Sequence, residues 1–165
     1  MSKLKSKLML AGVLVGCAFG GIGIGVVWAT PPSPPGTITT TLIAGPVALD
    51  EINIKVESDT HELKLKTKGE WETRVVHYSI VPAGHTGWHS HPGPVFVMIT
   101  AGTMTKYEAD DPTTAIVYPA GTGFVEGAGD THIAGNAGDV DLKFVAFFLI
   151  PKGAAPRIDE PAPQP

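Results

Sequence analysis

Three histidines are the residues whose type and spacing could carry chemistry in this chain of 165 residues. His89 and His91 stand two positions apart, and His132 follows further along the chain. Residues at i and i+2 project from the same face of a β-strand, so the first two imidazoles can reach one point. Neutral imidazole binds Zn, Cu, Fe and Ni. A cluster of histidines on a β scaffold therefore predicts a metal site.

The elements that must position these histidines are predicted to be short strands. The chain has 20 Gly and 15 Pro, too many helix breakers for a helical bundle, and no window shows a convincing amphipathic helix. Short strands joined by frequent turns predict an all-β sandwich or barrel. Strands are expected over residues 52–56, 62–66, 72–81, 95–100, 113–118 and 142–150.

Charge and cysteine content exclude several classes of function. Three of the 12 Lys and Arg residues precede an apolar N-terminal segment, and all 16 Asp and Glu follow it. The remainder of the chain is therefore acidic and offers no basic stripe for nucleic acid. The single cysteine, Cys17, lies inside the apolar segment, which leaves no thiol nucleophile and no thiolate metal site in the globular part.

The apolar segment over residues 8–29 carries no charge. At about 1.5 Å per residue, a helix of this length crosses a hydrocarbon core of roughly 30 Å. The three lysines before it predict an N-terminus inside and a domain on the extracytoplasmic side, so we expect a single-pass signal anchor in the cell membrane. Two alternatives stay open, a signal cleaved after Ala29 with secretion of the domain, and a lipoprotein signal ending at Cys17.

Small residues recur within this membrane segment. Gly12, Gly16 and Gly20 are four apart, which places them on one face of a helix where a second helix can approach closely. This spacing predicts a helix–helix partner in the membrane.

Composition divides the chain into four parts. Residues 1–29 are the signal anchor, and residues 30–36, with four prolines, are predicted to be a stiff spacer. Residues 37–150 form the single globular domain. Residues 151–165 form a proline-rich tail that we expect to be extended.

Around the histidines, the chain resembles the cupin superfamily of the type-2 kind. His89 and His91 fill the His-x-His of the family's first motif, and Gly102 fills its closing glycine. His132 and Asn136 fill the histidine and asparagine of the second motif. Two motifs in the right order make the match specific. The resemblance implies a double-stranded β-helix, the cupin jelly-roll barrel, here preceded by one N-terminal transmembrane helix.

The resemblance also implies the ligands of one divalent metal ion, which would be Zn, Fe, Cu or Ni. Carried over by position, the ligands are His89, His91 and His132. Val95 stands where the family has a glutamate, so we expect a three-histidine centre without a carboxylate, poor in affinity for hard ions such as Mn²⁺. Spacing singles out no substitute ligand among His77, His85, Glu108, Glu126 and Asp130.

The expected function is a membrane-anchored, extracytoplasmic cupin-domain protein that binds a metal and acts on a small molecule, with dioxygenase-type chemistry as one candidate. Fold alone does not decide this, since one fold hosts many functions. Two alternatives stay open, a non-catalytic ligand-binding module and an accessory subunit of a membrane complex. A homodimer is expected on resemblance only. The sequence identifies neither the small molecule nor any catalytic residue.

Overall fold

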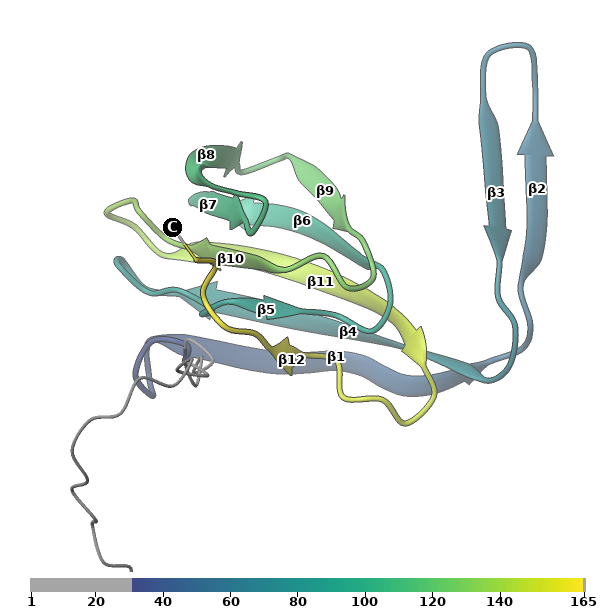
Figure 1. Ribbon diagram of the computed structural model, residues 1–165, viewed down its shortest axis with the longest axis horizontal. Coiled ribbons are helices and arrows are strands. Elements are labelled where there is room, and N and C mark those ends of the chain that lie inside the picture. Colours follow the sequence, from purple (N-terminus) through teal and green to yellow (C-terminus); the bar gives the residue numbers. More distant parts are fainter. Residues whose placement is uncertain (1–30, 165) are drawn as a thin grey trace, which may run out of the picture.

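The computed structural model describes residues 31–164, and over that range the chain is all β. Two five-stranded antiparallel sheets enclose a common interior (Figure 1), as expected for a double-stranded β-helix. The first sheet has the order β1(Ile38–Leu49), β4(Trp71–Ile80), β11(Leu142–Pro151), β6(Val95–Ala101), β9(Gly123–Glu126). The second has the order β12(Ile158–Asp159), β5(His89–Ser90), β10(His132–Gly135), β7(Thr103–Glu108), β8(Asp111–Pro119).

The interior is filled by alternate residues of the central strands. In β6, Val95, Val97 and Ile99 are buried while the residues between them face outward. This period of two is what a strand with one buried face requires. The same alternation runs along β11, and residues of β7 and β10 close the core from the second sheet. The site described below is therefore built inside a rigid apolar frame.

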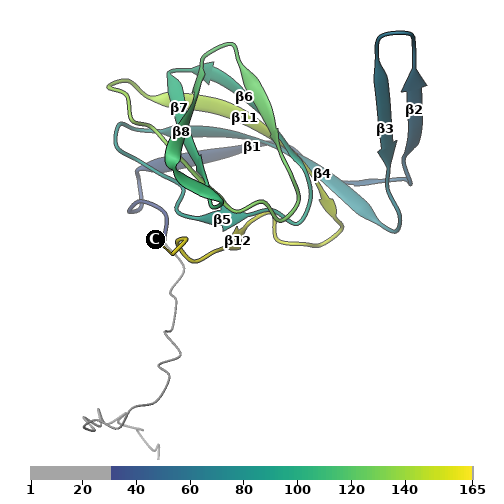
Figure 2. The same cartoon turned by 45° about the horizontal axis from the view of Figure 1, so that its top comes forward.

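All six predicted strands are present, with bounds that differ by at most two residues. Two of them, β2(Asn53–Glu57) and β3(Glu62–Lys66), form a hairpin that stands apart from the barrel (Figure 2). The expected transmembrane helix and its glycine spacing lie outside the described residues. Within residues 31–164, no helix is long and apolar enough to cross a membrane.

Two residues of the family-like motifs have structural roles. Gly102 makes the turn from β6 to β7 at a φ of +69°, and a Cβ there would lie 2.7 Å from the carbonyl oxygen of Asp141, so only glycine fits. Asn136 is buried and donates from Nδ2 to the carbonyl oxygens of Ile80 and Val140, each at 2.8 Å. It thus ties the loop after β10 to the end of β4.

Both proline-rich segments lie against the barrel. The Ser33 amide donates to the carbonyl oxygen of His85 at 2.9 Å, and the His85 amide donates to Ser33 Oγ at 2.8 Å. At the other end, the tail contributes the short strand β12, which pairs with β5, and the Glu160 amide donates to the Trp88 carbonyl oxygen at 3.0 Å. These contacts place both segments beside residues 85–90, next to the first two histidines.

Candidate metal centre

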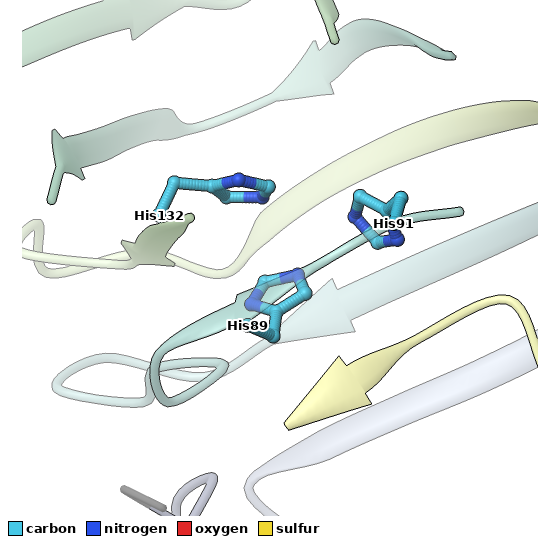
Figure 3. Close-up of side chains that lie close together, drawn as sticks. All are labelled: His89, His91 and His132. Atoms are coloured by element: carbon cyan, nitrogen blue, oxygen red, sulfur yellow. The ribbon is translucent and has the colours of Figure 1, made fainter. Parts of the chain in front are cut away.

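The structure brings the three predicted histidines together (Figure 3). His89 begins β5 and His91 follows its end, so both side chains project from the same face. His132 begins β10, and the antiparallel pairing of β10 with β5 sets it directly opposite His89. One ring nitrogen from each histidine lies within 4.8 Å of the others, and all three side chains are buried.

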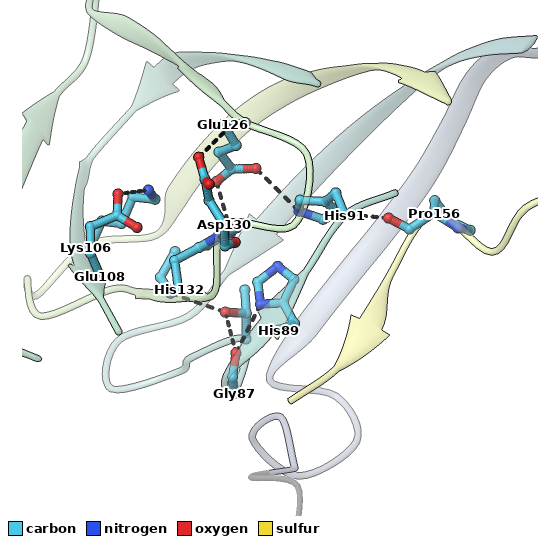
Figure 4. A network of polar contacts seen from close by, with 12 residues as sticks. Gly87, His89, His91, Lys106, Glu108, Glu126, Asp130, His132 and Pro156 are labelled. Carbon is cyan, nitrogen blue, oxygen red and sulfur yellow. Dashed lines mark hydrogen bonds and ion pairs between the residues drawn. The ribbon is translucent and has the colours of Figure 1, made fainter. Parts of the chain in front are cut away.

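Backbone carbonyls orient all three imidazoles in the same way (Figure 4). The Nδ1 atom of His89 lies 2.9 Å from the Gly87 oxygen, and that of His132 lies 2.9 Å from the Asp130 oxygen. His91 Nδ1 lies 2.6 Å from the oxygen of Pro156, in the C-terminal tail. A carbonyl oxygen only accepts, so each Nδ1 carries the proton. In the neutral ring the lone pair is then on Nε2, the form that binds a metal.

The group of side chains close enough to share one ion consists of the three predicted histidines, and a carboxylate that the spacing did not single out lies beside them. Glu126 ends β9 with only 6% of its surface exposed. Its Oε1 lies 3.0 Å from His132 Nε2 and its Oε2 lies 3.2 Å from His91 Nε2. Glu126 pairs in register with Val95 on β6, so the strand beside the expected position supplies the carboxylate.

The contacts of the Glu126 oxygens with the Nε2 atoms of His91 and His132 require a positive charge between oxygen and nitrogen. His132 Nε2 is buried and has no hydrogen-bond partner, although Glu126 Oε1 lies near it. A nitrogen lone pair and a carboxylate oxygen repel each other unless a proton or a metal ion lies between them. Metal–nitrogen bonds are about 2.0–2.1 Å long, so ligand atoms at right angles around one ion lie about 3 Å apart. The Glu126 contacts match that spacing, and the residues present fit a metal ion.

The other residues considered as substitute ligands are engaged elsewhere. His77 faces away from the interior, because its neighbours Val76 and Tyr78 pack against the core. His85 Nδ1 accepts a hydrogen bond from the Gly87 amide at 3.2 Å. Of the two remaining acids, Glu108 forms an ion pair with Lys106 and Asp130 Oδ2 accepts from the Gly127 amide at 3.1 Å.

Burial and neighbouring charges keep His89 neutral. Desolvation is the largest cause that lowers the pKa of His89 to about 3, and the charges of His132, Arg157 and His91 lower it further. Burial alone would raise the pKa of Glu126, but its contacts with His132 and His91 outweigh burial and lower that pKa below the usual value. At neutral pH the cluster thus offers an uncharged His89 imidazole and an ionised carboxylate.

The low pKa of His89 predicts acid sensitivity of the metal-free protein. Its value of about 3 in the fold lies below the unfolded value of 6.5, so between these pH values the unfolded chain binds a proton that the folded chain does not. The free energy of unfolding therefore decreases as the pH is lowered through this window, by about 2 kcal/mol between pH 7 and pH 5. Urea unfolding with chelator present, followed by tryptophan fluorescence, measures this loss. The His89→Gln variant should lose less, and an equal loss in both proteins contradicts the assignment.

The cluster opens into one large cavity. Its volume is about 610 Å³, and His89, His91 and Glu126 form part of its lining. Most of the remaining wall is apolar, and the proline segment at residues 31–35 and the tail residues Pro156 and Arg157 complete it. Phe148 also packs edge-on against the His91 ring, with centroids 5.6 Å apart. A ligand in this cavity would contact the cluster directly.

A comparison with protein families agrees with this architecture. Residues 76–148, which include all four clustered side chains, match the family model described as the cupin domain. These residues are therefore similar to a cupin domain. The match begins within β4 and ends within β11, so β1 and the β2–β3 hairpin precede the matched residues and the C-terminal tail follows them. No curated protein sequence matches this chain.

Among solved structures, the chain is similar to three bacterial proteins. A cupin superfamily protein from Desulfitobacterium hafniense DCB-2 has a TM-score of 0.48 and 13% identity, covering 70% of this chain and 79% of that one. A cupin-like protein from Thermotoga maritima MSB8 has a TM-score of 0.48 and 21% identity, covering 58% and 79%. A cupin domain from Bordetella pertussis Tohama I has a TM-score of 0.46 and 18% identity, covering 68% and 92%.

Proposed function

We propose that this protein holds one divalent metal ion between His89, His91, His132 and Glu126. The observation that carries the proposal is the common orientation of the three imidazoles. Each is fixed through Nδ1 by a backbone carbonyl, so that the Nε2 atoms are free for a metal. A buried carboxylate beside two of those nitrogens supplies negative charge.

Metal analysis of the full chain in detergent tests this proposal. After removal of metals and reloading with Zn²⁺, we expect one ion per chain. A variant with His91→Ala and His132→Ala should hold almost none, because two of three nitrogen ligands are gone. The matched control is His61→Ala, since His61 is exposed between β2 and β3, far along the chain from the site. Wild-type protein that stays metal-free after reloading contradicts the proposal.

We further propose that the metal faces a small molecule held in the cavity, with oxygenase-type activity as the reaction. The bound ion would supply Lewis acidity or oxygen activation. The residues of the chain hold it, balance its charge through Glu126 and keep water away through the apolar wall that includes Phe148. This reaction needs a coordination position free of protein ligands. Fe²⁺-loaded protein should therefore bind nitric oxide with a new paramagnetic signal, and a metal-loaded protein without that signal argues against oxygen chemistry.

We propose a membrane location on the strength of the sequence. The uncharged segment over residues 8–29 and the three lysines before it support a single-pass anchor with the cupin domain outside. Carbonate extraction of membranes from expressing cells distinguishes the cases. An anchored chain stays with the membranes at full length, whereas a cleaved chain is found in solution and starts after the apolar segment.

A further inference from the structure

We propose that the cavity takes a small organic carboxylate with an apolar body, and that Arg157 binds its acid group. This rests on the proposed function, since it treats the cavity as the place where a ligand meets the metal. It adds the chemical class of the ligand and a binding residue outside the metal cluster.

Contacts of the C-terminal tail with the barrel hold Arg157 in its place. Its neighbour Pro156 gives the carbonyl that orients His91, and the next two residues form β12, which pairs with β5. The backbone at Arg157 is thus held beside the strand of the metal cluster. Arg157 lines the cavity together with His89 and His91.

The hydrogen bonds of Arg157 are incomplete. Nε donates to Asp159 Oδ1 at 2.6 Å, which uses one of its five N–H groups. Nη2 is buried and has no hydrogen-bond partner among the described residues. A buried cationic donor without an acceptor is costly, and the usual partner of this planar group is an oxyanion. The Arg157 side chain is 29% exposed and lines the cavity, so an acid group bound there can pair with the N–H groups of the guanidinium that Asp159 does not use.

The charges around the cavity also favour an anion. Among residues 31–164, Glu126 is the one carboxylate in the lining, and its two oxygens lie against His91 and His132. With a divalent ion in place, the metal and Arg157 together exceed the charge of Glu126. Asp159 does not compensate fully, because its side chain is 57% exposed and well screened by water. A monoanion entering the cavity would therefore be attracted by both cations.

The apolar walls of the cavity indicate the chemical character of the part of the ligand that carries the acid group. Phe144, Phe148, Met104 and Val97 face the cavity and offer no hydrogen bonds, while Tyr78 stacks on Phe144 with ring centroids 4.7 Å apart. Such walls suit an aromatic or branched aliphatic body. A carboxylate on an apolar body satisfies both parts of the cavity, whereas a sugar or a polyphosphate would leave its polar groups unpaired.

Paired probes test the proposal on the full chain in detergent, loaded with Zn²⁺. Phenylacetate and phenylacetamide share one apolar body and differ in charge. Calorimetry should show at least tenfold tighter binding of phenylacetate to the wild type. Arg157→Gln should lose at least tenfold for phenylacetate and less than twofold for phenylacetamide. Lys152→Gln is the control, because Lys152 is another tail cation, paired with Glu70 at the surface, and it should change neither affinity.

Two results overturn the proposal. One is equal binding of the acid and the amide by the wild type, or no binding of either probe to protein that holds metal. The other is an Arg157→Gln variant that keeps the full affinity for phenylacetate. Metal content is measured on the same samples. A chain that holds no metal contradicts the proposed metal centre. The comparison of phenylacetate with phenylacetamide on that metal-free chain still tests whether Arg157 binds the acid group.

Discussion

Replacing Glu126 by Gln should lower the affinity for Zn²⁺ by about a hundredfold or more. Loss of an outer partner of a metal ligand typically costs about 10- to 100-fold, and loss of a direct, charged ligand should cost at least as much. The substitution keeps the shape of the side chain but removes the charge that lies 3.0 and 3.2 Å from two ligand nitrogens. Competition with a coloured chelator measures the affinity.

The matched control is Glu108→Gln. Glu108 stands opposite His132 in the pairing of β7 with β10, but its carboxylate is bound to Lys106. We expect its removal to change the affinity by less than threefold. Thermal unfolding of both metal-free variants checks that each one folds. If Glu126→Gln folds and binds Zn²⁺ as tightly as the wild type, the three histidines act without the carboxylate.

Deleting residues 156–165 should weaken metal binding by at least tenfold, although this segment contains none of the proposed ligands. The deletion removes the Pro156 carbonyl that orients His91 and the strand that pairs with β5. It also removes Glu160, whose Oε1 accepts a hydrogen bond from Ser90 Oγ at 2.7 Å. An imidazole free to rotate or to change tautomer binds a metal less well.

A shorter deletion gives the comparison. Removing residues 163–165 leaves β12, Pro156 and Glu160 in place, and the metal affinity should stay at the wild-type value. Circular dichroism of the metal-free proteins separates a change in His91 from a loss of the barrel. Should the longer deletion fold and bind metal normally, His91 does not depend on the tail.

Strands with a regular sequence pattern could be predicted, and strands whose pattern is interrupted could not. Apolar and polar residues alternate over the whole of β2 and β3, and β6 is a nearly continuous apolar run of strand length, so the sequence predicts all three strands. In β1, two register shifts interrupt the alternation after Leu42 and Ala44, and no strand is expected there.

Strand β7 is hidden for a different reason. Lys106 takes an interior position, 3% exposed, where it pairs with Glu108 and lies over the Phe124 ring at 5.3 Å. A lysine is ordinarily a sign of an outer face. Only contacts made by other strands allow this one to be buried, so a local pattern could not identify the strand.

The sequence by itself determined the all-β class, because period-two alternation is a local property of a strand. It also identified the histidine cluster, through the i, i+2 spacing of His89 and His91 and the motif that contains His132. Tertiary structure alone decided the rest of the centre. Glu126 joins it because β9 pairs with β6 in a register that sets Glu126 opposite Val95, and no spacing along the chain reports that register. Likewise, the proline-rich tail reaches the site only because β12 pairs with β5, which places the Pro156 carbonyl on His91 and Arg157 at the cavity.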